Sequence, residues 1–319
     1  MLYSAQLELT MTATTVNLTD PIFHNEDAAR DHFERIHWPN GPVCPHCGVV
    51  NEATLVRGKS HRPGLYQCNA CREPFTVKVG TVMEASHIPF TKWAMAFHLM
   101  AASKKGVSAH QLHRMLGVTY KTAWFLEHRI REAMRDTSGD KLGGAGMIVE
   151  ADETYVGGKP RRGTDGQKTK HDRKTPVAVL VERGGRARAV PVEHPLQNVL
   201  KVNIVANVER GTEIHTDQHK AYRGIGELIA GHHEHVNHTI NEFARDGIHS
   251  NSAESWNALL KRSIIGSFHH VSREHLARYC DEVSFRWDRR EITDAERAAD
   301  AIKNATGKRL TYRQPHRAQ

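Results

Sequence analysis

The hydrophobic and polar positions of the chain change their period along its length, which predicts a largely helical first part and a mixed second part. Apolar residues at helical spacing predict a helix over 26–37, which Asn25 can cap. The same spacing predicts helices through most of 90–136. Short strands are predicted between these regions, at 66–67 and 75–79.

A different pattern begins at Met147, where short apolar runs alternate with helical segments. Strands are predicted at 147–152, 176–182, 187–192, 212–217 and 235–239. Helices are predicted at 196–208, 221–229, 251–262 and 272–287. The order strand, hairpin, helix, strand, helix indicates a mixed α/β domain.

Four of the five cysteines form two C-x-x-C pairs, Cys44 with Cys47 and Cys68 with Cys71, separated by twenty residues. Zn²⁺ in structural sites is held tetrahedrally by four such thiolates from two hairpins, so the spacing predicts a zinc ribbon. Four thiolates leave no open coordination position, and we therefore expect a structural rather than a catalytic ion. The alternative is four unrelated thiols.

A glycine-containing turn at 117–119 separates two predicted helices, the first of which Ser108 can cap. Two helices joined in this way are typical of a helix-turn-helix. The second helix carries the basic residues Lys121, His128, Arg129, Arg131 and Arg135. We expect DNA contacts from Thr119, Tyr120, Lys121 and Arg129. The alternative is an ordinary helical hairpin with a solvated basic face.

The charge balance supports a polyanionic partner, because 44 Lys and Arg residues against 36 Asp and Glu residues give a net charge of +8. A loop at 159–174 holds seven basic residues, among them Lys159, Arg161 and Arg162. This loop can order on a phosphate backbone, or it can remain a solvated loop.

The cysteine usage suits a reducing compartment, and no apolar run reaches the roughly 18 residues of a membrane span. The N-terminus lacks the basic region and apolar block of a signal peptide, with Met11 as an alternative start to Met1. We expect a cytoplasmic, nucleoid-associated protein without a membrane partner.

Two of the predicted strands end in an acid, Asp152 and Asp217, and a predicted helix carries Glu254 on the same face as Asn251 and Lys261. If the strands are neighbours and the helix packs across them, three carboxylates converge. Such acids repel one another, and a divalent cation relieves the repulsion. Oxygen ligands favour Mg²⁺ or Mn²⁺, and two such ions support phosphodiester chemistry. Lys261 would hold a phosphate, although each residue alone is more often a turn, cap or surface residue.

Several segments together resemble the zinc-ribbon DDE transposases of bacterial insertion sequences: 152–159 (DETYVGGK), 215–222 (HTDQHKAY), 249–262 (HSNSAESWNALLKR), 266–272 (GSFHHVS) and 286–290 (RWDRR). The resemblance covers roughly residues 26–290 in the order ribbon, helix-turn-helix, catalytic domain. It implies a ribonuclease-H-like α/β domain, a mixed sheet with flanking helices, in which Asp152 and Asp217 bind the catalytic metal.

The third metal ligand stays open between Glu254 and Asn251, because some members of this group carry Asn at the third position. Glu254 is favoured, since an anion binds Mg²⁺ better than an amide does. The resemblance further implies that the protein binds the inverted-repeat ends of an element, cleaves there, and joins the 3′-hydroxyl to target DNA as a homodimer or higher oligomer. Two alternatives are a non-catalytic zinc-ribbon DNA-binding regulator with a relic catalytic domain, and a metal-dependent DNA nuclease of the same fold.

These features divide the chain into six expected segments. They are a disordered tail at 1–25, an N-terminal helix and zinc ribbon at 26–85, a helix-turn-helix region at 86–136, a linker at 137–146, the ribonuclease-H-like domain at 147–292 and a basic tail at 293–319.

Overall fold

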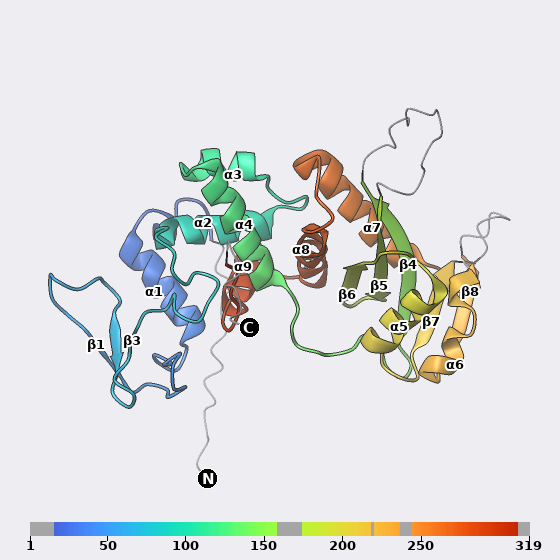
Figure 1. Cartoon of the computed structure of the whole chain (residues 1–319), viewed down its shortest axis with the longest axis horizontal. Helices are drawn as coiled ribbons and strands as arrows, with labels where there is room; N and C mark the ends of the chain where they lie inside the picture. Colours follow the sequence, from blue (N-terminus) through green and yellow to red (C-terminus); the bar gives the residue numbers. More distant parts are fainter. Residues whose placement is uncertain (1–15, 158–173, 218–219, 237–243, 246, 312–319) are drawn as a thin grey trace, which may run out of the picture. The chain divides into compact units, whose positions relative to one another are not determined.

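The computed structural model describes residues 16–157, 174–217, 220–236, 244–245 and 247–311 (Figure 1). The chain forms two compact units. The first contains the described residues through Ala102 together with 291–309, and the second contains 103–290 together with the described residues after Arg309. A stretch near the C-terminus therefore belongs to the same unit as the predicted zinc ribbon.

The first unit combines a small sheet with helices. Its elements are the 3-10 helix η1 (Pro21–Phe23), α1 (Glu26–His37), β1 (Ala53–Leu55), β2 (Tyr66–Cys68), β3 (Pro74–Phe75), α2 (Phe90–Ala102) and α9 (Asp294–Lys303). The strands pair antiparallel in the order β1-β2-β3. Rings of Trp38, Tyr66 and Phe75 pack around the cysteine-bearing strand and supply most of its small core.

Helix α1 has the bounds that the hydrophobic spacing predicts, and Asn25 caps it by accepting hydrogen bonds from the N–H groups of Asp27 and Ala28. Glu26, in the first turn of α1, caps α2 in turn. Its carboxylate accepts hydrogen bonds from the N–H groups of Phe90 (2.7 Å) and Thr91 (3.1 Å). One acidic side chain thus fixes the start of the next helix.

The predicted disordered tail and the predicted basic tail each contain a helix. In the predicted tail 1–25, η1 buries Ile22 and Phe23. In the predicted tail 293–319, Thr293 and Glu296 form a capping box that starts α9. Helix α9 packs on α2, and its buried side chains are mostly alanines. Small buried residues between charged ones give a weak apolar pattern, which is why the sequence did not reveal this helix.

The second unit holds the helical pair and a larger mixed sheet. Its elements are α3 (Ala109–Leu116), α4 (Tyr120–Met134), β4 (Ile148–Val156), β5 (Thr175–Glu182), β6 (Ala187–Pro191), α5 (Gln197–Asn207), β7 (Glu213–Asp217), η2 (Lys220–Tyr222), α6 (Ile225–Ile229), β8 (His233–Val236), α7 (Asn251–Ser263), the π-helical turn η4 (Ile264–Phe268) and α8 (Leu276–Asp288).

The large sheet has the strand order β6-β5-β4-β7-β8. Strand β5 is antiparallel to both β4 and β6, whereas β4 pairs parallel with β7 and β7 pairs parallel with β8. Among these five strands, β5 therefore runs against the other four. Figure 1 shows helices on both faces of the sheet. This arrangement confirms the expected α/β class with a ribonuclease-H-like mixed sheet.

Each face of the sheet has its own apolar core. One core joins alternate residues of β5 to α7 and α8 and includes Val177, Val179, Val181, Trp256 and Leu260. The other joins β4 and the intervening residues of β5 to α5 and α6 and includes Val149, Ala151, Leu180, Leu200 and Ile204. Because Asp152 pairs with Val179 in the ladder, its side chain belongs to the α7 face.

Two boundaries differ from the prediction. Asp152 does not end its strand, since β4 continues to Val156, which pairs with Thr175 of β5. The stretch 137–146 is not a free linker either. Leu142 is fully buried in the core beside α5, and its N–H donates to the carbonyl of Asn207 (2.8 Å).

Candidate active site and metal centre

The four cysteines predicted as zinc ligands come together in the first unit. Their sulfur atoms all lie within 4.8 Å of one another. The Sγ atoms are 3.7 Å apart in the pair Cys44–Cys71 and 3.6 Å apart in the pair Cys47–Cys68. Four sulfurs around Zn²⁺ at about 2.3 Å form a tetrahedron with edges of about 3.8 Å, so the cluster has the size that this ion requires.

The backbone prepares one of these thiols for metal binding. The N–H of Cys71 donates to Sγ of Cys68 (3.5 Å). This hydrogen bond is the main cause that lowers the pKa of Cys68 to about 7. A thiolate is the form that binds a metal ion, and the turn between the two cysteines therefore favours the binding form.

The three acids predicted from the sequence gather on the α7 face of the large sheet. Strands β4 and β7 pair with Ala151 opposite Thr216, so that Asp152 and Asp217 are the next positions on neighbouring strands. Burial raises the pKa of Asp152 to about 6, the N–H of Glu153 opposes this, and the charges of Asp217 and Glu254 raise the pKa further. Asp217 and Glu254 are therefore close enough to influence the ionisation of Asp152.

The carboxylates do not form a closed ligand set. Within the described part of the chain, the cysteines are the only group of three or more ionisable ligands whose donor atoms lie within 4.8 Å of one another. Glu254 and Asn251 are exposed on α7, and Oε1 of Glu254 accepts a hydrogen bond from Oγ of Ser250 (3.3 Å). A divalent cation would offset the repulsion between these acids, and their oxygen donors suit Mg²⁺ or Mn²⁺.

Asn257 touches Asp152 directly, and sequence reasoning missed it. Its side chain is 5% exposed, and Nδ2 donates to Oδ2 of Asp152 (2.7 Å). The sequence does contain a signal for this residue. Asn257 follows Glu254 by three positions, which places both on neighbouring parts of one helical face. Lys261, predicted to bind phosphate, is exposed four residues further along α7.

A fourth acid, Glu153, adjoins the cluster and was also missed. Burial raises the pKa of Glu153 to about 7, a hydrogen bond from Tyr222 opposes this, and the charges of Asp217 and Asp152 add to the increase. Burial likewise raises the pKa of Tyr222, with the Glu153 charge adding to it. Because Glu153 pairs with Ala178 in the ladder, its side chain lies on the α5 face of the sheet, opposite the cluster, and acts on the site through its charge.

Helices α3 and α4 form the predicted helix-turn-helix in the second unit. Gly117 adopts a left-handed conformation (φ 59°) and ends α3, and Thr119 caps α4 by accepting a hydrogen bond from the N–H of Thr122. Tyr120 is 46% exposed and stacks on His110 with ring centroids 4.4 Å apart. Thr119 and Lys121 are exposed beside it.

Arg129, predicted to contact DNA, lies in the middle turns of α4, where the basic side chains are not solvated. His128, Arg129 and Arg131 are buried. Arg131 forms an ion pair with Glu282 of α8 (2.7 Å) and donates a hydrogen bond to Glu127 (3.3 Å), so it holds α4 to α8. Arg129 packs over the ring of Phe125 and is only 9% exposed, which does not favour a DNA contact. Lys159, Arg161 and Arg162 lie outside the described residues.

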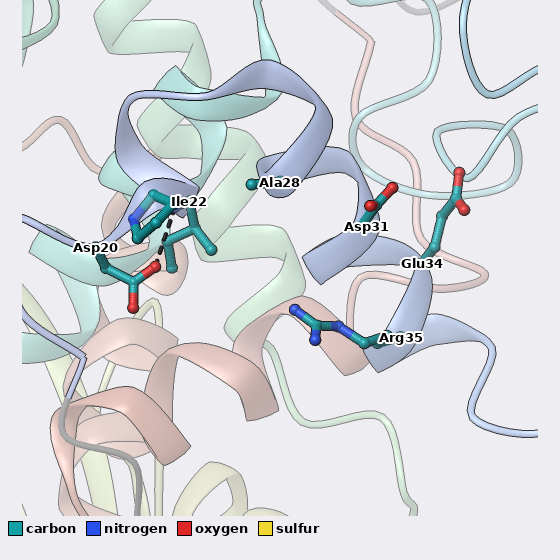
Figure 2. A pocket seen from close by; sticks show the side chains of 7 residues that line it. Asp20, Ile22, Ala28, Asp31, Glu34 and Arg35 are labelled. Atoms are coloured by element: carbon teal, nitrogen blue, oxygen red, sulfur yellow. Dashed lines mark hydrogen bonds between the residues drawn. The ribbon is translucent and has the colours of Figure 1, made fainter.

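A cavity of about 580 Å³ lies in the first unit beside η1 and α1 (Figure 2). Two of the three acidic side chains that line it accept hydrogen bonds that stabilise the fold. Asp20 accepts a hydrogen bond from the N–H of Ile22, and Glu34 accepts one from the hydroxyl of Tyr66 (3.0 Å). The cavity therefore does not compete with the carboxylate cluster as the candidate active site.

A mixed sheet with acids beneath a helix, in a chain that also carries a cysteine ribbon and a helix-turn-helix, is the combination of the zinc-ribbon DDE transposases that the sequence resembles. Comparison with known domains supports this class. Residues 24–73 match the transposase zinc-ribbon domain, and residues 141–288 match the ISXO2-like transposase domain.

A protein of Halobacterium salinarum described as an uncharacterized protein in transposable element ISH50 is 30% identical over 271 residues, which are 81% of this chain and 89% of that protein. The chain therefore belongs to the family of transposases that combine a zinc ribbon with an ISXO2-like transposase domain. Among solved structures, the crystal structure of the Mos1 strand transfer complex aligns with 68% of this chain and 79% of that chain. Its TM-score of 0.23 and 12% identity are too low to support an argument.

Helix length and hydropathy show whether a helix could span a membrane. None of the helices in the described residues is both long and apolar enough to cross a membrane.

Proposed function

We propose that this transposase binds the ends of an insertion element, hydrolyses the phosphodiester there, and joins the freed 3′-hydroxyl to target DNA. The observation that carries the proposal is the proximity of Asp217 and Glu254 to Asp152, whose pKa is raised to about 6 by burial and further by the charges of these two acids. Acids that destabilise one another in the absence of a cation form a site that a cation stabilises.

The residues proposed to hold two divalent ions, Mg²⁺ or Mn²⁺, are Asp152, Asp217 and Glu254. When bound, such ions activate the attacking oxygen and stabilise the leaving oxygen of a phosphodiester. Neighbouring residues of the protein hold and orient these three carboxylates. Lys261 attracts a phosphate of the DNA. Glu254 is proposed over Asn251 as the third ligand because an anion binds Mg²⁺ better than an amide does, and its charge acts on Asp152.

The proposed DNA contacts divide between three parts of the chain. The exposed N-terminal end of α4, with Thr119, Tyr120 and Lys121, is proposed to read the element end. The basic residues Lys159, Arg161 and Arg162 are proposed to bind phosphates. A structural Zn²⁺ on the four cysteines is proposed to hold the ribbon. Because two ends must be processed together, a homodimer or higher oligomer on DNA is proposed.

Labelled duplexes that carry the terminal inverted repeat of the element test the proposal. In Mn²⁺, the wild-type protein should nick the end and join it to a plasmid, whereas Asp152→Ala and Asp217→Ala should bind the duplex without nicking or joining. Unchanged joining in either variant would remove that residue from the mechanism. DNA binding without nicking in any metal would favour a regulator, and nicking without joining would favour a nuclease.

A second pair of variants addresses the third ligand. Glu254→Gln removes the charge and keeps the size of the side chain, and Asn251→Ala removes an amide one helical turn earlier. If Glu254 binds the metal, only Glu254→Gln should abolish nicking. The reverse result would assign the ligand to Asn251.

A further inference from the structure

A buried carboxylate lies two residues before Asp152 on the same strand. Glu150 is fully buried, and its Oε2 accepts hydrogen bonds from the N–H groups of Ser252 (2.6 Å) and Ala253 (3.1 Å). The hydroxyl of Ser252 donates to its Oε1 (3.1 Å). The two N–H groups belong to the first turn of α7, where a helix offers no backbone acceptor for them. A side chain from the sheet therefore caps this helix.

The residue that precedes α7 does not supply this cap itself. Ser250 makes no side-chain cap bond and instead donates its hydroxyl to Glu254. Arg183 donates from Nε to Oε1 of Glu150 (3.0 Å) and from Nη1 to the carbonyl of Gly247 (2.9 Å). His249 adds a contact from Nδ1 to Oε1 (3.2 Å). The buried charge is thus compensated, and the approach to α7 is tied to the same point.

The spacing of two contacts along the strand matches their spacing along the helix. Glu150 and Asp152 are two residues apart on one face of β4, a rise of about 6.6 Å. Ala253 and Asn257, which bond to them, are four residues apart on one face of α7, a rise of about 6 Å. The helix therefore lies along the strand with two points of attachment, which fix both its position and its rotation.

We propose that Glu150 is a positioning residue of the active site, which sets the start and rotation of α7 so that Glu254 and Asn257 face Asp152. This inference rests on the proposed function, since it assigns Glu150 a role in the metal-binding geometry of that site. Burying an acid costs free energy unless it is paired, and an apolar residue would fill a β-strand position more simply. The position of α7 explains why an acid stands here.

The variant Glu150→Gln in the full-length protein tests the proposal, with Asp288→Asn as the matched control. Asp288 is also a carboxylate that accepts a backbone N–H, from Ala187 (2.8 Å), but the charges that act on it are those of Arg289, Arg186 and Asp136 and not those of the acid cluster. Two measurements on the DNA-free protein are decisive. They are Mn²⁺ affinity by calorimetry and amide hydrogen exchange in residues 250–258.

Glu150→Gln should bind Mn²⁺ at least about ten-fold more weakly and lose exchange protection in the first turn of α7, as is usual when a residue that orients a metal ligand is changed. Nicking by Glu150→Gln should recover partly at high Mn²⁺ concentration, and Asp288→Asn should match the wild type in all three measurements. Wild-type Mn²⁺ affinity in a folded Glu150→Gln protein would overturn the proposal.

A milder variant keeps the test decisive if Glu150→Gln does not fold. Ser252→Ala removes only the hydroxyl that donates to Glu150 and should weaken Mn²⁺ binding in the same direction. Unchanged affinity and exchange in Ser252→Ala would then reject the positioning role. A wild-type protein that binds no Mn²⁺ and does not nick would overturn the proposed function itself. If the wild type does both, failure of the variants to weaken Mn²⁺ binding rejects the positioning role alone.

Discussion

The hydrogen bond from Asn257 to Asp152 should control the pH at which the proposed metal site becomes available. Burial raises the pKa of Asp152 to about 6, and Asn257 opposes the increase by donating to the ionised carboxylate. A hydrogen bond to a charged group contributes about 1.5 kcal/mol, which corresponds to about one pH unit. The variant Asn257→Ala should therefore raise the pKa of Asp152 to about 7.

The consequence for metal binding depends on pH. At pH 6 the ionised fraction of Asp152 falls from about one half to about one tenth, so Mn²⁺ affinity should fall about five-fold. At pH 8.5 Asp152 is ionised in both proteins, and the two affinities should agree. Calorimetric titration of the DNA-free proteins with Mn²⁺ at both pH values measures this difference.

A matched control separates this effect from a general loss of packing. Asn207→Ala removes another side-chain amide, which is half-buried on the other face of the sheet and donates to the carbonyl of Asn203 (2.8 Å). It should leave Mn²⁺ affinity unchanged at either pH. If Asn257→Ala weakens Mn²⁺ binding equally at pH 6 and pH 8.5, the electrostatic reasoning is wrong and the amide acts through geometry alone.

Three further predictions concern stability. Chelation of the ion at the four cysteines should unfold the small sheet of the ribbon, and metal analysis should find about one zinc per chain; a folded ribbon without metal would contradict this. Glu282→Gln should cost about 3–5 kcal/mol in urea unfolding, because it leaves the buried guanidinium of Arg131 without its closest partner; a loss below 1 kcal/mol would count against the pair. Burial raises the pKa of Glu127 to about 8, so the folded state keeps a proton that the unfolded state releases near pH 4.5. The free energy of unfolding of the wild type should therefore fall by up to about 4 kcal/mol between pH 5 and pH 8.5, and that of Glu127→Gln should not. Parallel pH profiles of the unfolding free energy in the two proteins would refute the assignment.

Periodicity located most elements because their buried faces are large and apolar. The α1 helix, the β5–β6 hairpin and α7 lie where the pattern predicted them, since each packs one continuous face on a core. It failed for α9, whose buried face is built from alanines, and for η1, which is too short to show a period. The sequence pattern also placed the end of β4 too early, at Asp152, because an acid within a strand gives the same pattern as an acid that ends one.

The charge of a residue predicted its burial less reliably than the hydrophobic periodicity predicted the elements. Arg131 and Glu150 are charged residues of the kind that usually lies at the surface. Both are fully buried because each has partners that are distant in the sequence. No local pattern contains such partners. For Glu150 there was one usable signal, since it shares a strand face with Asp152 at a spacing of two. The metal-binding cysteines needed no such context, because their spacing alone defines the ligand set.

The packing of α9 on α2 has a consequence for the order in which the protein is made. Arg297 of α9 donates to the carbonyl of Ala101, and Ala301 and Ile302 are buried in the same unit. Roughly 200 residues separate the two helices in the chain, which at ribosomal rates of about 5–20 residues per second is roughly 10–40 s of synthesis. During that interval the apolar face of α2 is without its covering helix, so a message truncated before α9 would yield a cysteine ribbon attached to an exposed, aggregation-prone surface.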